Sequence, residues 1–415
     1  MSKITLTNGQ QDAVEKIGVF WDKYGDDDKL KFSPVFRLAG YAGTGKSTCI
    51  SSFINETGLD DDMVATITFT GRAALVLRNK GHKATTIHKL IYRPVEREET
   101  YEEVNEHGQT VKKKRTKIEF ILKTRDEIIN GTEDDPRDEP LKLIVIDEAS
   151  MVSAEIYNDL VKFNLPIIAV YDPGQLPPVF GKSPILSNEP DVFLTEIMRQ
   201  ALDNPIVKLS MWARDGRFIP YGNYDDKVLV ISKNQLTDDM LLQADIVLAT
   251  THKRKDTVNK YIREELLGRT KPHPMLNDKL IFLKNNWEIT NGDVPIINGL
   301  IGTLTEPISF EHCETGLFKA TITPDGSEIP FENIECNLDV FNPTLDRKAK
   351  EEIIKAFHSK GIMMDSGYCI TVHKSQGGEF PNVVFFADLW GDGEMRKRLL
   401  YTAITRASEK LIIVR

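Results

Sequence analysis

The stretch GYAGTGKST at residues 40–48 constrains the fold of this chain more than any other part of its sequence. It matches the phosphate-binding pattern G-x-x-x-x-G-K-[ST] and follows the apolar run VFRLA at residues 35–39. Such a loop forms where a strand ends and a helix begins, because the helix N-terminus turns its free backbone amides toward phosphate oxygens. The pattern therefore predicts a strand, a loop and a helix in a parallel sheet, with a nucleotide bound at the loop.

The segments on either side of this loop alternate between helical and strand patterns. We expect helices over residues 6–21, 46–58 and 71–81, and strands over residues 35–40 and 63–70. An alternation of this kind is typical of a parallel sheet with helices packed on both faces. The N-terminal part of the chain is therefore predicted to be an α/β domain.

The alternation continues along the chain and then starts a second time. Buried strands are expected within LKLIVIDEAS (141–150) and LPIIAVYDPGQLPPV (165–179), each with acidic or polar residues at its C-terminal end. The alternation restarts over residues 244–267 and returns from residue 350 to the C-terminus. This pattern predicts a second α/β domain.

Two stretches interrupt the alternation. After Pro94, an acid-rich segment (96–106) and a basic segment (111–123) flank a turn-like HGQT, and a hairpin would place opposite charges across from each other. The alternative is a solvated insertion that is partly mobile.

From Met275 to about Val340, short apolar runs separated by Asn-Gly and Pro-Asp-Gly turns predict a small β-barrel inserted into the second domain.

Composition narrows the class of protein. A chain of 415 residues with 40% hydrophobic and 28% charged residues predicts two to four globular domains. No apolar stretch approaches the roughly 20 residues that span a bilayer, and the N-terminus lacks a secretory h-region, so we expect a cytoplasmic protein. The four cysteines form no C-x-x-C pair, which disfavours structural zinc and disulfides. A net charge of −9 argues against coating nucleic acid by charge, but it permits a local groove that grips one strand.

The polar residues at the strand ends predict nucleotide hydrolysis. Lys46 is placed to neutralise the β- and γ-phosphates, and Ser47 and Asp147 are placed to hold Mg²⁺. Glu148, beside the metal-binding acid, is the candidate base that orients the attacking water. A kinase does not need such a neighbour, so the Asp-Glu pair favours hydrolysis over phosphoryl transfer.

Coupling hydrolysis to movement requires a sensor of the γ-phosphate and a cation that closes on it. Gln175, in DPGQLPPV, is the candidate sensor. Arg199, in LTEIMRQ, and Arg406, in YTAITRA, are the candidate closing arginines. Such an arginine contributes about 10³–10⁵ to the rate in related systems.

Taken in order, these segments resemble the motifs of superfamily 1 helicases, in the RecD/Dda-like branch, across nearly the whole chain. The matching segments are LTNGQQDAV, GYAGTGKST, TFTGRAA, TTIHKL, VIDEAS, YDPGQLPPV, LTEIMRQ, TNGDVPIINGLIGTL, TVHKSQGGEF and YTAITRA. YDPGQLPPV departs from the usual Gly-Asp-x-x-Gln but keeps the Asp and the Gln at the usual distance.

The resemblance implies an α/β fold with two RecA-like parallel-sheet domains, a β-hairpin insertion in the first and an SH3-like β-barrel insertion in the second. The implied boundaries are 1–92 and 141–200 for the first domain (1A), 93–140 for the pin-like hairpin (1B), 201–274 and 350–415 for the second domain (2A), and 275–349 for the barrel (2B).

The resemblance also implies where ATP, Mg²⁺ and a nucleic acid strand bind. Gln10 would read the adenine edge, Glu379 would touch the ribose, and Arg199 and Arg406 would reach the γ-phosphate. The residues assigned to the nucleotide are Gln10, Gly43, Thr44, Gly45, Lys46, Ser47, Thr48 and Glu379. The residues assigned to the single strand are Thr70, His88, Thr371 and His373.

The implied activity is an ATP-dependent 5′→3′ DNA helicase or translocase that acts on single-stranded DNA in replication, recombination or repair. Its implied partners are single-stranded DNA, single-strand/duplex junctions, and single-strand-binding or replisome proteins. We expect no membrane partner, a monomer, and a bacterial or phage-infected host cytosol. Three alternatives stay open: a translocase that displaces bound proteins without unwinding, an RNA helicase, and a partner-regulated ATPase subunit.

Overall fold

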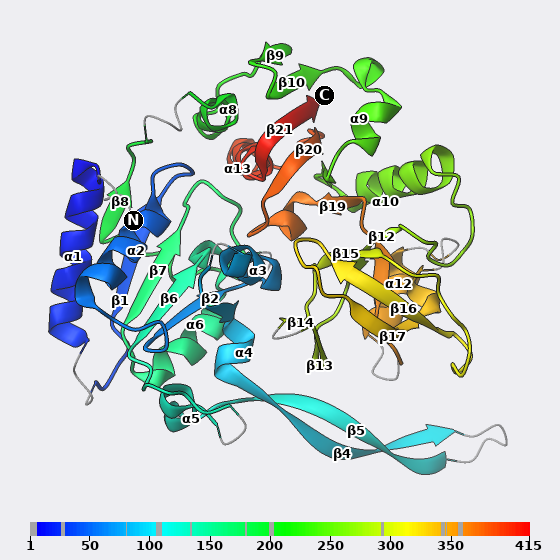
Figure 1. Ribbon diagram of the computed structural model, residues 1–415, viewed down its shortest axis with the longest axis horizontal. Helices are drawn as coiled ribbons and strands as arrows, with labels where there is room; N and C mark the ends of the chain where they lie inside the picture. Colours follow the sequence, from blue (N-terminus) through cyan, green and yellow to red (C-terminus); the bar gives the residue numbers. More distant parts are fainter. Residues whose placement is uncertain are drawn as a thin grey trace.

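The structure is a computed structural model that describes residues 6–25, 30–79, 81–104, 110–132, 135–178, 181–198, 203–291, 294–341, 345, 347–355 and 360–415. Figure 1 shows two α/β lobes side by side, an antiparallel sheet next to the second lobe, and a long hairpin that projects from the first. Arg199 lies outside the described residues, and so do the first three residues of the expected HGQT turn, which end at Gln109.

The first lobe is built on a six-stranded sheet in the order β3-β2-β6-β7-β1-β8, and all its pairings are parallel. Its strands are β1 (Val35–Gly40), β2 (Val64–Thr68), β3 (Ala84–Thr86), β6 (Leu143–Asp147), β7 (Ile167–Tyr171) and β8 (Val192–Leu194).

Helices cover both faces of this sheet. The helices and short 3₁₀ turns are α1 (Asn8–Tyr24), α2 (Lys46–Thr57), α3 (Gly71–Asn79), α4 (Ile87–Ile91), α5 (Arg125–Asn130), η1 (Ala149–Met151), α6 (Ala154–Leu160) and η2 (Val161–Phe163). α1 and α2 share one hydrophobic cluster with the sheet, and α4 and α6 share another. Neighbouring β6 residues alternate between them, with Val145 in the first and Ile146 in the second. An unbroken apolar run such as LIVI is therefore a strand buried on both faces.

The second lobe has a six-stranded sheet in the order β19-β11-β20-β21-β10-β9. Only the pairing of β9 with β10 is antiparallel among its described pairings. Its strands are β9 (Gly222–Tyr224), β10 (Val228–Ile231), β11 (Ile246–Ala249), β19 (Cys369–Thr371), β20 (Phe380–Phe386) and β21 (Ala407–Val414).

The helices of the second lobe also lie on both faces of its sheet. They are α8 (Pro205–Arg214), η3 (Lys233–Gln235), α9 (Asp238–Leu242), α10 (His252–Lys260), its π-helical continuation η4 (Tyr261–Leu266), η5 (Val372–Ser375) and α13 (Gly393–Ile404). α8 and α13 pack on one face, and α9 and α10 pack on the other. α13 therefore lies on the face that also buries Leu176 of the first lobe.

The charged stretch after α4 forms two long antiparallel strands, β4 (Tyr92–Val104) and β5 (Thr110–Leu122). Their register places Glu99 opposite Arg115 and Glu102 opposite Lys112. Near the base, Arg97 Nη1 lies 3.1 Å from Glu119 Oε2. The acidic strand therefore runs against the basic strand, and the ribbon extends away from the lobe (Figure 1).

A five-stranded antiparallel sheet, in the order β17-β16-β15-β12-β18, lies beside the second lobe. Its strands are β12 (Lys279–Phe282), β15 (Ile301–Leu304), β16 (Leu317–Pro324), β17 (Phe331–Asn337) and β18 (Met364–Ser366), accompanied by the ribbon of β13 (Asn286–Asn291) and β14 (Val294–Ile296) and by α11 (Leu338–Phe341) and α12 (Arg347–Lys355). β18 pairs with β12 although it lies beyond residue 349. The sheet thus takes a strand from the range expected for the second lobe.

Within the described residues, no helix combines the length and apolarity needed to cross a membrane.

Candidate functional site

The phosphate-type loop connects β1 to α2, as the sequence predicts. Gly43 and Gly45 have φ values of 78° and 81°, a left-handed conformation that glycine adopts without strain. Gly45 is the N-cap of α2 and provides no side chain to bond the first amides of the helix. Those amides are therefore available for an anion at the helix N-terminus. The Lys46 ammonium donates to the carbonyl oxygens of Gly40 (2.8 Å) and Tyr41 (3.2 Å), so it lies over the loop.

Gln10 supports this loop from α1. Its side chain is 1% exposed, Nε2 donates to the Thr44 carbonyl at 3.0 Å, and Oε1 accepts from the Thr7 amide at 2.9 Å. A Cβ atom on Gly45 would lie 2.3 Å from Gln10 Nε2, so any other residue there would displace the buried amide of Gln10. Gln10 thus contacts the backbone of the loop itself, while Ser47 is exposed on α2.

The two acids of VIDEAS lie at the C-terminal end of β6. Asp147 is level with Thr68 of the neighbouring strand β2. Glu148 has a φ of 53°, an uncommon conformation for a residue with a side chain. Residues held in such conformations cluster at functional sites, because surrounding contacts must offset the strain.

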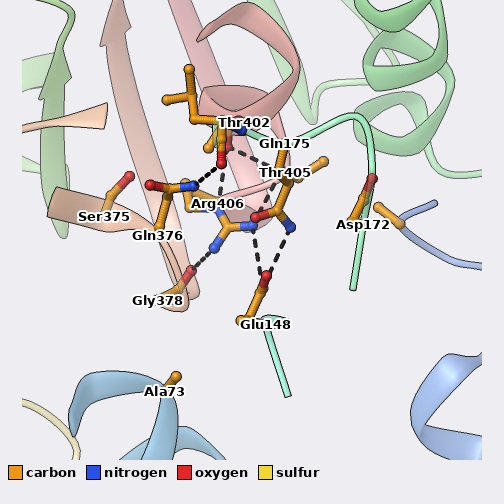
Figure 2. A network of polar contacts seen from close by, with 12 residues as sticks. Ala73, Glu148, Asp172, Gln175, Ser375, Gln376, Gly378, Thr402, Thr405 and Arg406 are labelled. Atoms are coloured by element: carbon orange, nitrogen blue, oxygen red, sulfur yellow. Dashed lines mark hydrogen bonds and ion pairs between the residues drawn. The ribbon is translucent and has the colours of Figure 1, made fainter. Parts of the chain in front are cut away.

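Glu148 belongs to a polar network with Gln175 and Arg406 (Figure 2). Arg406 Nη2 lies 4.0 Å from Glu148 Oε1. With the Gln175 amide oriented to suit both neighbours, its nitrogen donates to Glu148 Oε2 at 3.1 Å and its oxygen accepts from Arg406 Nη2 at 3.3 Å. The acid and the amide come from the first lobe and the arginine from the second, so this network crosses the boundary between the lobes.

Backbone and hydroxyl oxygens of the second lobe fix the Arg406 guanidinium. Nη1 donates to the Gly378 carbonyl at 3.0 Å, Nε to the Thr402 carbonyl at 3.2 Å, and Nη2 to Thr405 Oγ1 at 3.2 Å. The side chain is 4% exposed. Glu379 follows Gly378 in the chain and is exposed.

Sequence reasoning assigned no role to two residues that join the lobes, Asp172 and Tyr401. The Tyr401 hydroxyl donates to Asp172 Oδ2 at 2.5 Å and accepts from the Ala42 amide of the phosphate-type loop at 2.9 Å. Burial raises the pKa of the Asp172 carboxyl, and it raises the pKa of the Tyr401 hydroxyl well above its usual value. Both residues lie within the quoted motifs, but no local spacing indicates that they meet.

The loop after β7 makes three further hydrogen bonds to the second lobe. The Leu176 amide donates to Thr402 Oγ1 at 3.1 Å, and the Leu176 carbonyl accepts from Gln376 Nε2 at 2.8 Å. The Gln175 carbonyl accepts from Arg398 Nη1 at 3.0 Å. The candidate sensor loop is therefore attached to α13 and to the segment after η5.

All four residues predicted to contact a strand line one cavity of about 850 Å³. Thr70 and His88 come from the first lobe, and Thr371 and His373 come from the second. The lobes approach closely beside it, since a Cβ atom on Gly377 would lie 2.8 Å from Thr70 Oγ1. Burial lowers the pKa values of both histidines, which favours their neutral form.

Two cations, Arg72 and Lys374, also line this cavity, and among the described lining residues there is no carboxylate. Burial lowers the pKa of Arg72 to about 10, and its guanidinium lies 3.9 Å from the centroid of the Phe380 ring. Burial lowers the pKa of Lys374 to about 8. The cavity is thus a largely apolar site with hydroxyl, amide and imidazole groups and little positive charge.

Comparison with known families gives two matches, on opposite sides of the site. Residues 29–181 match the family described as an AAA domain, and residues 366–414 match the UvrD-like helicase C-terminal domain. The first match contains the loop and the two acids, and the second contains Arg406. The network in Figure 2 therefore lies where the two matched segments meet.

Two curated relatives align over most of the chain. The ATP-dependent DNA helicase Pif1 of Campylobacter jejuni is 25% identical over 91% of this chain and 88% of its own length. The ATP-dependent RecD2 DNA helicase of Deinococcus radiodurans is 25% identical over 92% of this chain, which spans 47% of that protein.

Solved structures share the fold. Pif1 helicase from Candida albicans has a TM-score of 0.50 at 17% identity and covers 99% of this chain and 94% of its own. Bacteroides Pif1 bound to single-stranded DNA has a TM-score of 0.52 at 17% identity, with coverages of 99% and 92%. With both family matches and the two relatives, these findings confirm the resemblance seen in the motifs. Along most of its length, the chain is therefore similar to the superfamily 1B helicases, in the branch of RecD-like and Pif1-like proteins.

Proposed function

We propose that this protein is an ATP-driven motor that moves 5′→3′ on single-stranded DNA and separates duplex strands. One observation carries the proposal: Glu148 and Gln175 of the first lobe contact Arg406 of the second lobe. A γ-phosphate at this network would be sensed by both lobes at once. Its cleavage would therefore change how the lobes meet, as in other enzymes that close around a nucleotide.

ATP fits the phosphate-type loop by chemistry and shape. Lys46 would release the loop carbonyls and bind the β- and γ-phosphates, while the uncapped amides of α2 would bind phosphate oxygens. Gln10, Thr44, Thr48 and Glu379 stay predicted nucleotide contacts. Arg199 stays a prediction outside the described residues.

Mg²⁺ also fits the donors at this site. A serine hydroxyl at position 47 and a carboxylate at position 147 are hard oxygen donors, which Mg²⁺ combines with waters and substrate phosphates. The described residues contain no cluster of three or more His, Cys, Asp or Glu side chains that would hold a metal without a nucleotide. The ion would balance phosphate charge, and Glu148 would orient the attacking water.

The cavity between the lobes is the proposed path of the strand. Thr70, His88, Thr371 and His373 line it together, although the chain brings them from two lobes. Parallel α/β sheets bind ligands at the carboxyl ends of their strands, which is where these residues lie. Hydroxyl and ring contacts need few cations, so a protein of net charge −9 can hold DNA in this way.

The accessory elements complete the proposal. We assign residues 1–92 and 141–200 to a RecA-like domain 1A, and 201–274 with 350–415 to domain 2A. The β4–β5 ribbon would be the pin that splits the duplex, and the antiparallel sheet would be the SH3-like domain. Because β18 pairs with β12, we extend that last domain to include Met364–Ser366.

Strand separation is energetically feasible for such a motor. Opening duplex DNA costs on average about 1.4 kcal/mol per base-pair step, which one ATP supplies with margin. Both curated relatives are named ATP-dependent DNA helicases, which favours DNA over RNA. Monomeric action, a cytosolic location and contacts with single-strand-binding or replisome proteins stay predictions from the sequence.

The deciding experiment is strand displacement on duplexes that carry a 5′ or a 3′ tail, in DNA and in RNA, together with ATPase stimulation by each strand. We expect unwinding of 5′-tailed DNA and stimulation by single-stranded DNA, with both abolished in Lys46→Ala. Unwinding of RNA would favour an RNA helicase. Strand-stimulated ATPase without unwinding would favour a protein-displacing translocase, and no stimulation would favour a partner-regulated ATPase.

A further inference from the structure

Aromatic side chains line both walls of the cavity that we propose as the strand path. Phe69 and His88 of the first lobe lie edge to face, with ring centroids 6.4 Å apart. In the second lobe, the His373 and Trp390 rings are stacked, with centroids 6.3 Å apart and an interplanar angle of 22°. Each lobe therefore presents an aromatic pair to the same space.

Trp390 lies in the loop after β20, and a hydrogen bond to another part of the second lobe holds its indole in a defined position. Its Nε1 donates to the Thr250 carbonyl at 3.0 Å, and Thr250 Oγ1 donates to the Asp388 carbonyl at 2.6 Å. The Asp388 carboxylate bonds Arg254 Nε at 2.6 Å and Lys233 Nζ at 3.0 Å. These bonds tie the loop that carries Trp390 to Thr250, which directly follows β11, to α10 and to the start of η3.

Although its polar atom is satisfied, Trp390 remains 41% exposed. Its hydrogen bond to Thr250 is separate from the described contacts of Glu148, Gln175 and Arg406. An anchored indole with exposed apolar surface in a cavity has the properties of a preorganised binding platform. It is positioned before any ligand arrives, so little conformational freedom is lost on binding.

The rest of the lining indicates what kind of ligand such a platform would take. The described lining residues offer two cations and no acid, several hydroxyl and amide groups, and histidines whose neutral form burial favours. A phosphate chain alone would find few charged partners here. A ligand with flat apolar faces and polar edges would find many apolar and hydrogen-bonding partners. Nucleobases have that chemistry.

We propose that Trp390 is a base-stacking platform of the second lobe, on which a nucleobase of the single strand lies without sequence preference. The inference rests on the proposed function, because it needs a strand in the cavity. Together with Phe69 and His88 across the cavity, it would give each lobe an aromatic grip on the strand. Binding would then depend on bases as well as on phosphates, and it would weaken less with salt than binding by charge alone.

The test compares a normal strand with one that lacks bases. Equilibrium binding of wild type, Trp390→Ala and Trp390→Phe is measured by fluorescence anisotropy for oligo-dT and for an abasic oligomer of the same length. We expect Trp390→Ala to weaken oligo-dT binding by about 5- to 150-fold, as expected for the loss of one stacking aromatic. The same change should leave abasic binding nearly unaltered, and Trp390→Phe should retain most of the preference for oligo-dT.

Phe218→Ala provides the matched control. Phe218 is an aromatic residue that is 71% exposed and does not line the cavity, so its removal should not change the ratio of the two affinities. A second readout uses the intrinsic fluorescence of the four tryptophans, which a stacked base quenches. Trp390→Phe should remove most of the quenching while the protein still binds oligo-dT. Circular dichroism checks that each variant is folded.

The possible failures are distinguishable. If wild type binds oligo-dT and Trp390→Ala keeps the wild-type ratio of oligo-dT to abasic affinity, the stacking role is wrong and the proposed motor function stands. The same conclusion follows if Trp390→Ala weakens both strands equally. If wild type binds neither strand and its ATPase does not respond to DNA, the proposed function and this inference both fail.

Discussion

The Tyr401 hydroxyl lies between the Asp172 carboxylate, to which it donates at 2.5 Å, and the Ala42 amide, from which it accepts at 2.9 Å. Tyr401 is 1% exposed and belongs to α13, whereas Ala42 lies in the phosphate-type loop of the first lobe and Asp172 directly follows β7. A buried hydrogen bond to a charged group is stronger than one between neutral groups. This contact therefore connects the phosphate-type loop directly to the second lobe.

Tyr401→Phe should lower the free energy of unfolding by about 1.5–3 kcal/mol, the usual contribution of a hydrogen bond to a charged group. The substitution leaves the buried Asp172 carboxyl without this donor and the Ala42 amide without its acceptor. Urea unfolding measures the effect. Tyr224→Phe is the control, because its more exposed hydroxyl bonds only the Pro220 carbonyl among the described partners, at 2.9 Å. Equal losses in both variants would contradict a special role for the Tyr401 contact.

Glu148→Gln should abolish turnover but preserve ATP binding, because the amide keeps the shape of the side chain and cannot accept a proton from water. General-base catalysis contributes about 10²–10⁴ to a rate, so the DNA-stimulated kcat should fall by that factor. Single-turnover hydrolysis and nucleotide binding separate the two effects. Glu155→Gln, on the exposed face of α6, should behave as wild type. Normal turnover in Glu148→Gln would remove Glu148 from catalysis.

Arg406→Lys should impair hydrolysis although it keeps the positive charge. A lysine lacks the planar fork that bonds the Gly378 and Thr402 carbonyls while it faces Glu148. We expect the DNA-stimulated kcat to fall by up to about 10³–10⁵, with a smaller effect on ATP affinity. Arg396→Lys is the control, since Arg396 lies on α13, which precedes Arg406 in the chain, and its side chain is exposed. Similar kcat values for the two variants would argue that Arg406 only supports the fold.

Shortening the β4–β5 ribbon should separate translocation from unwinding. Thr100 and Lys114 are directly paired, so replacing residues 101–113 with Asn-Gly closes a shorter hairpin with a two-residue turn. The Arg97–Glu119 ion pair at the base is retained. We expect strand displacement to fall and DNA-stimulated ATPase to persist. Unchanged strand displacement would show that the ribbon is not the pin.

Stability should fall as the pH is lowered below about 6.5. Burial lowers the pKa values of His88, His252 and His373 from the usual 6.5, so the unfolded chain binds protons before the folded chain does. The stabilisation is complete above the unfolded pKa and is lost as the pH falls through the folded pKa values. Urea unfolding at several pH values measures the slope. His88→Gln with His373→Gln should reduce it, because two of the three histidines with a lowered pKa are then removed.

Local stereochemistry made much of the fold predictable. The expected strand at residues 35–40 and the helix that ends at Gly58 agree with β1 and α2, and Thr7 caps α1 near the start of the helix expected from residue 6. Glycines with positive φ and hydroxyl N-caps act over a few residues, so their signals lie within the motif itself. The register of the charged ribbon also follows from the segments beside it. The family was recognisable for the same reason, because each motif is a short local unit.

Long-range packing decided the rest. Tyr401 and Asp172 are 229 positions apart, and β18 joins β12 across the end of the expected insertion. The His373–Trp390 stack likewise depends on how the loop after β20 packs on the second sheet. The sequence by itself determined the local units and the order in which they occur. Which side chains of the two lobes meet was decided only in the tertiary structure, because those contacts depend on the docking of whole sheets and helices, and no local spacing encodes that geometry.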